Sequence, residues 1–325
     1  MTVRAGIIER ALLCVFACAA AVSWWCTNAI APVHAQEFAR AARLNPTIKL
    51  AITLDDLPRS ENLPAGYDSL QLIDELVATL KDHHVASVTG FVIGARVGSD
   101  VTARAALARW TGAGHEFGNH SYSHRSLDEL GSDLYLSDVA RLTPMLRALD
   151  PGGVAASFRY PFLEEGQSTQ QRALVSRGIA QLGYTVARVS VDFSDWAWGD
   201  PYARCLARGD HAAVQLLSRS YVQHASASLE WSVQAARQVL RRPLVHVLLL
   251  HANVATARTL DALLSEYERL GAQFVPLSEA LSDPAYTADY DARGGNLLTM
   301  ISATNNRPLP PWQARPLELL ELVCR

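Results

Sequence analysis

The chain has 325 residues, of which 49% are hydrophobic and 19% charged, and this composition excludes an intrinsically disordered protein. Its length suits one large α/β domain or two small ones. The formal net charge of -3 gives no reason to expect a nucleic acid as partner, and we predict none.

The N-terminal segment has the pattern of an export signal. Arg4 and Arg10 precede an apolar run over residues 11–25, and small residues follow at the two positions that signal peptidase reads. We therefore predict a signal peptide over residues 1–35 and a linker over residues 36–47. The uncharged stretch is also long enough for an uncleaved membrane anchor, the only case in which we expect contact with a membrane. Both alternatives predict export to the periplasm or the extracellular space.

After this segment, apolar runs of strand length alternate with amphipathic stretches. We predict strands over residues 49–54, 86–93, 156–159, 185–191, 244–250 and 273–275. We predict helices over residues 70–80, 101–111, 127–149 with a break at Pro144, 168–182, 211–219, 226–241 and 256–270. Strands that are apolar on both faces and separated by helices form a parallel sheet with helices outside.

The number of such units, about seven, predicts one α/β domain over residues 48–283. We expect a distorted (β/α)7-type barrel of mostly parallel strands with helices outside, and an open doubly wound sheet is the alternative.

A C-terminal extension over residues 284–325 follows, which we expect to be mostly irregular with a short helix at residues 317–322. Three of the five cysteines lie in the leader, so Cys205 and Cys324 remain outside it. In an oxidising compartment these two can pair and tie the extension to the domain. Two unpaired thiols are the alternative.

Polar residues follow the predicted strands, and the C-terminal ends of strands are where reactive residues gather in a parallel α/β barrel. Asp55 and Asp56 are adjacent carboxylates that repel each other unless a cation shares their site. A loop acid beside a helix-capping acid is the alternative.

Two histidines form a second candidate group. His120 and His124 are four residues apart, and on a helical turn both imidazoles can reach one metal ion. Two histidines and one carboxylate are a usual catalytic zinc shell, with water in the open position. Incidental histidines in a polar surface loop are the alternative.

Three further residues stand at strand ends or beside acids. Arg159 ends an apolar strand, and a buried guanidinium needs an acidic partner, for which Asp55 is the candidate. His251 directly follows an apolar strand and is a candidate acid or base, or else a satisfied core histidine. Trp196 lies beside Asp195, where an aromatic face suits sugar stacking as well as core packing.

These residues belong to five motifs in a fixed order. The motifs are Thr53-Leu54-Asp55-Asp56, His120-Ser121-Tyr122-Ser123-His124, Arg159-Tyr160-Pro161-Phe162, Asp192-Phe193-Ser194-Asp195-Trp196 and Leu249-Leu250-His251. In this order they resemble the polysaccharide deacetylases of carbohydrate esterase family four, which carry the nodulation-protein-B homology domain. The chain departs from the family at Leu57, where many members have Gly, and at Ala252, where Asp is common. Both positions adjoin the site, so the departures bear on the substrate class.

The resemblance implies that Asp56, His120 and His124 hold a catalytic metal ion. Zn²⁺ is the expected ion, and such a shell also accepts Co²⁺, Mn²⁺ or Fe²⁺. The implied function is hydrolysis of the acetamide group of N-acetylated sugars in a polysaccharide or oligosaccharide. An O-acetyl esterase or a non-sugar amide hydrolase is the alternative on the same scaffold. A non-catalytic glycan-binding module is the alternative from another class.

The resemblance also implies roles around the metal. Asp55 would be the general base and His251 the general acid. Three further residues would support catalysis. Arg159 would orient Asp55, and Asp195 would support the charge of His251. The backbone N–H of Tyr160 would hold the oxyanion. The substrate-binding residues would be Trp196 and Leu249, which wall the pocket for the acetyl methyl, together with Tyr160 and Pro161.

Overall fold

The computed structural model describes residues 47–325 apart from 61–62, 154–155, 291–293 and 313. The predicted signal peptide over residues 1–35, its three cysteines and all but the last residue of the predicted linker lie outside the described residues. Among the helices that are described, none combines the length and the apolar character needed to cross a bilayer.

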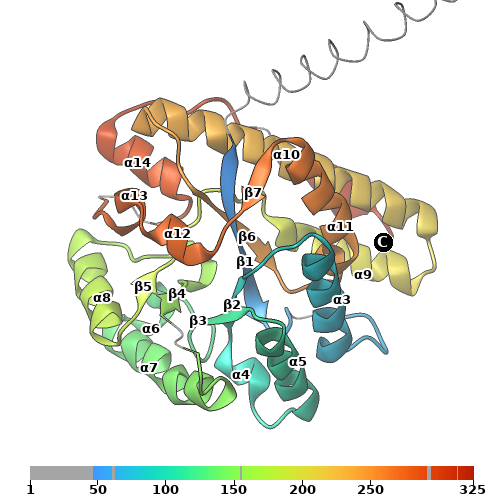
Figure 1. Ribbon diagram of the computed structural model, residues 1–325, viewed down its shortest axis with the longest axis horizontal. Coiled ribbons are helices and arrows are strands. Elements are labelled where there is room, and N and C mark those ends of the chain that lie inside the picture. Colours follow the sequence, from blue (N-terminus) through green and yellow to red (C-terminus); the bar gives the residue numbers. More distant parts are fainter. Residues whose placement is uncertain (1–46, 61–62, 154–155, 291–293, 313) are drawn as a thin grey trace, which may run out of the picture. The chain divides into compact units, whose positions relative to one another are not determined.

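A parallel sheet lies at the centre of the fold, with helices around it (Figure 1). Its strands are β1 (Ile48–Leu57), β2 (Thr89–Val92), β3 (Glu116–Asn119), β4 (Ser157–Phe158), β5 (Thr185–Val186), β6 (His246–His251) and β7 (Ala272–Phe274). They are hydrogen-bonded in the order β5-β4-β3-β2-β1-β6, and β7 pairs with the first three residues of β1. Because β1 has neighbours along both edges and side chains packed on both faces, it is buried from Leu50 to its end.

The sheet curves so that its two ends approach each other. Beyond β5 the chain runs beside β6, where Val191 forms a parallel bridge with Leu248. The N–H of Leu249 donates to the carbonyl oxygen of Val191 at 3.0 Å. These contacts confirm the predicted α/β fold, a distorted (β/α)7-type barrel.

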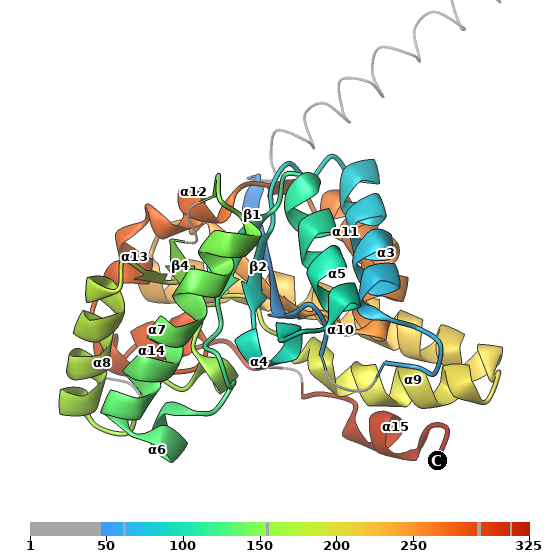
Figure 2. The same ribbon diagram turned by 90° about the horizontal axis from the view of Figure 1, so that it is seen from below.

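The helices cover the outside of the sheet (Figure 2). They are α3 (Ser69–Asp82), α4 (Gly94–Val97), α5 (Val101–Gly112), α6 (Leu127–Leu130), α7 (Ser132–Leu149), α8 (Thr169–Gln181), α9 (Gly199–Ala207), α10 (His211–Leu240), α11 (Val254–Arg269), α12 (Leu277–Leu281), α13 (Pro284–Thr287), α14 (Leu297–Asn305) and α15 (Leu317–Leu322). Two short 3₁₀ helices, η1 (Pro161–Leu163) and η2 (Asp195–Trp198), follow β4 and precede α9.

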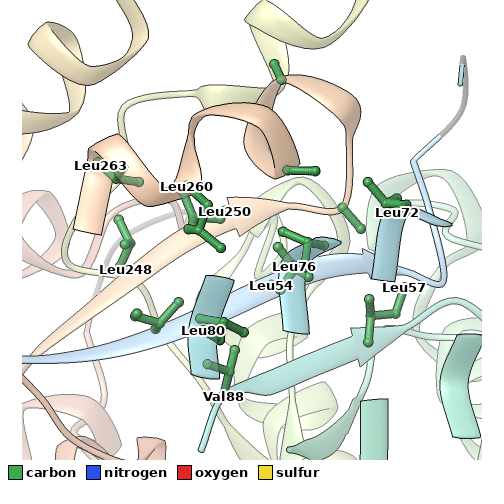
Figure 3. Packing of buried hydrophobic residues seen from close by; sticks show 14 of the residues in the cluster. Leu54, Leu57, Leu72, Leu76, Leu80, Val88, Leu248, Leu250, Leu260 and Leu263 are labelled. Atoms are coloured by element: carbon green, nitrogen blue, oxygen red, sulfur yellow. The ribbon is translucent and has the colours of Figure 1, made fainter. Parts of the chain in front are cut away.

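Leucines at helical spacing explain how the helices dock on the sheet. Leu72, Leu76 and Leu80 lie on one face of α3 and are at most 2% exposed. They pack with leucines of β1, β6 and α11 in one apolar cluster (Figure 3). This cluster fixes the strands whose C-terminal ends carry the polar residues of the motifs.

Two predicted helix breaks are wrong. The chain breaks at Gly131, which has a φ of 71°, and α7 then continues through Pro144. Leu142 and Leu146 are buried on either side of this proline, so packing compensates for the hydrogen bond that proline cannot form. The two helices predicted over residues 211–219 and 226–241 are one helix, α10, because Tyr221 and Ala225 continue its buried face.

The sequence prediction contained no strand at Glu116–Asn119, where β3 lies. This segment has a single large apolar side chain, Phe117, so it lacks the apolar run that identified the other strands. It forms a strand because β2 provides a parallel partner from Thr89 to Val92.

The C-terminal extension is more ordered than predicted. The short helix at its end is confirmed as α15, but α13 and α14 contradict the mostly irregular description. Leu297, Leu298 and Ile301 of α14 are at most 1% exposed and pack in a core cluster with residues of α10 and β6. Cys205 of α9 and Cys324 form a disulfide, which confirms the paired alternative, and Figure 2 shows α15 beside α9.

Candidate active site

The two aspartates of the first motif lie at the C-terminal end of β1. Asp55 is in register with His251 at the end of the neighbouring strand β6. Asp56 has a φ of 72°, in the left-handed region that side chains other than glycine rarely adopt. Ser121 and His124 share this conformation, with φ of 65° and 58°. Strained residues gather where the surrounding structure imposes a functional geometry, and here they gather at one end of the barrel.

Asp56, His120 and His124 come together at this point. One potential ligand atom of each residue lies within 4.8 Å of the other two. Asp56 Oδ1 is 3.8 Å from His120 Nε2 and 3.4 Å from His124 Nε2. This oxygen is buried, and no described residue forms a hydrogen bond with it. A buried carboxylate oxygen without a donor requires a partner, and a cation is the partner that suits it.

The protonation of the two histidines supports the same interpretation. His120 Nδ1 lies 2.8 Å from the carbonyl oxygen of Arg159, which only accepts, so Nδ1 carries the proton and Nε2 presents a lone pair. Burial lowers the pKa of both His120 and His124 to about 4, so both rings are neutral at neutral pH. Two neutral imidazoles and one carboxylate fit a divalent metal ion such as zinc.

The second oxygen of Asp56 is held by residues that the sequence had not singled out. Ser60 Oγ donates to Asp56 Oδ2 at 3.2 Å, and Arg96 Nη1 lies 3.2 Å from the same oxygen. Burial alone would raise the pKa of Asp56, but the positive charges of His251 and Arg96 hold it well below its ordinary value. The Asp56 carboxylate is therefore ionised and held in one orientation, in which Oδ1 faces His120 and His124.

The expected helical turn between the two histidines is wrong. His120 directly follows β3, and His124 lies in the loop beyond it. Asn119 Oδ1 accepts from the N–H of Ser121 at 2.8 Å, and Ser121 Oγ accepts from the N–H of His124 at 3.0 Å. These bonds fold the loop so that the two rings approach to 4.9 Å between centroids. The predicted meeting of both imidazoles is present, but a loop produces it.

The predicted pair of Arg159 and Asp55 is present. Arg159 Nη1 lies 3.2 and 3.4 Å from the two carboxylate oxygens of Asp55. Its other donors reach Thr53 Oγ1 and the carbonyl oxygen of Ala187, and its guanidinium lies 4.5 Å from the ring centre of Phe91. Arg159 is 1% exposed, so these contacts fully enclose it. Burial raises the pKa of Asp55 to about 6, against the opposing effect of Arg159.

His251 is paired with Asp195, as predicted. His251 Nδ1 lies 2.7 Å from Asp195 Oδ1, and the backbone N–H of His251 donates to Oδ2 at 2.8 Å. Thr256 Oγ1 donates to Oδ2 at 3.0 Å. Burial would lower the pKa of His251, but the charge and hydrogen bond of Asp195, with the charges of Asp56 and Asp55, outweigh it and raise the pKa to about 10.

A cavity of about 380 Å³ opens onto these groups. It is lined by Asp55, Asp56, His120, His124, Phe162, Leu163, Asp192, Trp196, Leu249 and His251. The predicted substrate-binding residues Trp196 and Leu249 are thus brought to the cavity.

Tyr160 and Pro161, also predicted to bind substrate, are not among the residues that line this cavity. Both are buried, and the ring of Tyr160 stacks on Tyr135 with centroids 5.9 Å apart. The chain turns at Phe162 and Leu163, whose φ values are 58° and 56°. Because of this turn, Phe162 and Leu163 line the cavity instead.

Some of the site residues that the sequence analysis did not name could have been identified from the sequence. Arg96 follows a strand, as the predicted site residues do, but the periodicity does not distinguish it from an ordinary helix residue. Phe162 belongs to the third motif, and its neighbour Leu163 lies just beyond it. Ser60 carries no signal, since only the turn after β1 brings it to Asp56.

Residues 44–187 match the family model described as polysaccharide deacetylase, a span that contains the first three motifs. The resemblance predicted from the motifs is therefore confirmed over this part of the chain. Curated proteins gave no match to the sequence.

Solved structures with a similar fold include a mutant of BA3943 from Bacillus anthracis, a CE4 family pseudoenzyme with restored enzymatic activity. It is 20% identical, with a TM-score of 0.50, and the match covers 73% of this chain and 68% of that chain. The wild-type pseudoenzyme is 18% identical, with a TM-score of 0.49 and coverage of 73% and 66%. Peptidoglycan deacetylase PdaC from Bacillus subtilis is 20% identical, with a TM-score of 0.48 and coverage of 73% and 92%. At 20% identity, the match to the BA3943 mutant establishes the fold alone.

Proposed function

We propose that this chain is a metal-dependent hydrolase that removes acetyl groups from the acetamides of N-acetylated sugars in a polysaccharide or oligosaccharide. The observation that carries the proposal is the convergence of Asp56, His120 and His124, whose ligand atoms lie within 4.8 Å of one another. Asp55 and His251 stand beside this cluster, in register on adjacent strands. The match to the polysaccharide deacetylase family model supports the acetylated glycan as the substrate class.

Asp56, His120 and His124 are the proposed ligands, and Zn²⁺ is the preferred ion, with Co²⁺, Mn²⁺ or Fe²⁺ as alternatives. When bound, such an ion would polarise the acetamide carbonyl and make a water molecule more acidic. Arg96 and Ser60 hold the second oxygen of Asp56, so the carboxylate presents Oδ1 without rotating. The carbonyl oxygen of Arg159 fixes the ring of His120 in the same way.

Asp55 is the proposed general base, which takes a proton from the attacking water. Arg159 contacts both of its oxygens and holds the carboxylate in place. Burial raises the pKa of Asp55 to about 6, and a base is most effective when its pKa lies near the working pH.

His251 is the proposed general acid for the leaving amine. Asp195 accepts a hydrogen bond from Nδ1–H, which leaves Nε2–H of the charged ring as the group that donates its proton to the leaving amine. The pKa of about 10 keeps the ring charged at neutral pH. The backbone N–H of Tyr160 is the proposed donor to the acetamide oxygen as it gains negative charge. Leu249 and Trp196 border the cavity and would favour the small acetyl methyl.

Mass spectrometry of acetyl loss from matched N-acetylated and O-acetylated oligosaccharides, with and without a chelator, tests this proposal. We expect loss from the N-acetylated set, stopped by the chelator and restored by zinc. Loss from the O-acetylated set alone would support the esterase alternative. Protein that binds glycan, holds no metal and releases no acetate would support the glycan-binding module.

We also propose that the domain is exported. The predicted signal peptide supports this, and so does the disulfide between Cys205 and Cys324, because such bonds persist in oxidising compartments. N-terminal sequencing of the protein recovered from the cell envelope and the medium tests it. A mature chain that begins at Gln36 would support cleavage, whereas a retained leader would support the anchor.

A further inference from the structure

The C-terminal extension lies against helix α10 before it reaches its last helix. Trp231 Nε1 donates to the carbonyl oxygen of Pro310 at 2.9 Å. Two residues further along the extension, the ring of Trp312 lies 5.6 Å from that of His224. Since the contacts on α10 move toward its N-terminus as the extension advances, the two segments run antiparallel.

The end of the extension is attached to α9. Leu320 of α15 is 5% exposed and packs in the apolar cluster that includes residues of α3 and β1. Arg204 Nη2 lies 3.4 Å from the carbonyl oxygens of Leu320 and Val323. The disulfide between Cys205 and Cys324 adds a covalent link, and Figure 2 shows α15 beside α9. The chain between α10 and α15 is therefore held against the barrel at both of its ends.

Arg315 lies in this held segment and contacts a residue of the active site. Its guanidinium is 5.1 Å from the ring centre of Trp196, a distance at which a cation is attracted to the face of an indole. No carboxylate of the described residues forms an ion pair with Arg315, so the Trp196 ring is the partner that the structure offers to its charge.

Trp196 is a side chain whose orientation needs such a contact. It is 56% exposed, whereas Asp195 and Trp198 of the same short helix, η2, are fully buried. Asp195 fixes the backbone of η2 through its hydrogen bonds to His251. An exposed indole can still occupy several rotamers, and only contacts of the ring select one of them. Because Trp196 lines the metal-site cavity, this choice decides the shape of one wall.

We propose that Arg315 is a positioning residue for deacetylation and that it acts through Trp196. Its guanidinium holds the indole in the rotamer that borders the metal-site cavity, so the wall is formed before the substrate binds. The barrel places the backbone of Trp196, and the C-terminal extension completes the site by fixing its ring. This inference rests on the proposed function and gives the extension a part in it.

Kinetics of the full-length, zinc-loaded protein on tetra-N-acetylchitotetraose test this role. Arg315→Ala should raise KM about two- to fivefold, the factor that corresponds to one cation–π contact at an exposed site. It should leave kcat nearly unchanged, because Asp55 and His251 rather than Trp196 move the protons. Arg315→Lys, which keeps the cation, should restore part of the loss.

Arg258→Ala is the matched control. Arg258 lies 5.6 Å from the ring centre of Tyr67, and neither residue lines the metal-site cavity. This variant also loses an ion pair with Glu75, so a general loss of stability would appear in it as well. We expect its KM to equal that of the wild type.

A second background shows whether the effect runs through Trp196. Trp196→Leu keeps an apolar side chain without the indole, and there Arg315→Ala should cause no further rise in KM. Acrylamide quenching of tryptophan fluorescence gives a readout without substrate. The emission that Trp196→Leu removes belongs to Trp196, and acrylamide should quench this emission more strongly in Arg315→Ala than in the wild type.

An unchanged KM, a rise of the same size in both backgrounds, or unchanged quenching of Trp196 in folded Arg315→Ala protein would overturn the positioning role and leave the proposed function intact. If the wild-type chain removed acetyl from no N-acetylated oligosaccharide, the proposed function would fail, and the role of Arg315 in deacetylation with it. The quenching would still decide whether Arg315 holds the Trp196 ring.

Discussion

His251 and Asp195 are joined by two hydrogen bonds, one through the imidazole and one through the backbone. Nδ1 lies 2.7 Å from one carboxylate oxygen, and the backbone N–H donates to the other at 2.8 Å. Asp195 therefore fixes both the end of β6 and the orientation of the ring that β6 carries. Burial would lower the pKa of His251, but the charge and hydrogen bond of Asp195, together with the charges of Asp56 and Asp55, outweigh it and raise the pKa to about 10.

The first prediction concerns the alkaline limb of the pH profile. A raised pKa means that the charged, proton-donating form of His251 persists at higher pH and is lost as pH rises through about 10. In Asp195→Asn this support is removed, so kcat/KM for an N-acetylated oligosaccharide should fall at a lower pH than in the wild type. The profile of kcat/KM against pH measures the shift. If the alkaline limb did not shift in Asp195→Asn, His251 would not be the general acid.

The sequence predicted well which polar residues lie at the C-terminal ends of the strands. A polar residue that directly follows a buried parallel strand must emerge at the C-terminal edge of the sheet. This rule places Asp55 and His251 side by side, and the structure has them in register on β1 and β6. Arg159 follows β4 in the same way and meets Asp55 across the barrel.

The loops were the part that the sequence could not predict. His120 and His124 meet because Ser121 and His124 adopt left-handed backbone conformations, which no hydrophobic periodicity reveals. Ser60 reaches Asp56 only through the turn that follows β1. Such contacts depend on tertiary packing between elements far apart in the chain, so the motifs identified the main chemical groups but not their supports.

Substitutions of the two adjacent aspartates should distinguish the general base from the metal ligand. Asp55→Asn should lower turnover by about 10²–10⁴-fold, the contribution of general base catalysis, and keep its metal. Asp56→Asn should lose the metal as well, because it removes the charged ligand that faces both histidines. Elemental analysis of the purified variants beside an activity assay makes the comparison. Metal lost with Asp55 but retained without Asp56 would reverse the two assignments.

The role of His251 as general acid can be tested with two substrates that differ in their leaving groups. His251→Ala should reduce hydrolysis of an acetamide far more than hydrolysis of an activated acetyl ester, because an activated phenolate leaves without a proton while an amine does not. The ratio of kcat/KM for the two substrates measures this difference. Equal losses on both substrates would point to a role in structure or binding instead.

The last prediction concerns Gly294, which supports the turn that lines the cavity. Gly294 has a φ of 97° and forms an antiparallel bridge with Glu164, and the N–H of Gly295 donates to the carbonyl oxygen of Leu163 at 2.9 Å. A Cβ at Gly294 would meet that same carbonyl oxygen and lie 2.8 Å from the backbone nitrogen of Glu165. The C-terminal extension thus holds Phe162 and Leu163 in place at the cavity.

Gly294→Ala should therefore displace this turn as well as strain the backbone. We expect it to lower the free energy of unfolding by about 1–3 kcal/mol and to reduce kcat/KM at temperatures where the protein stays folded. Gly271→Ala is the control, because Gly271 has a similar φ of 89° but open space around its Cβ position. Gly271→Ala introduces the backbone strain without a steric clash, so it should lower the free energy of unfolding without lowering kcat/KM. Equal kinetic effects in the two variants would show that the extension stabilises the barrel without shaping the site.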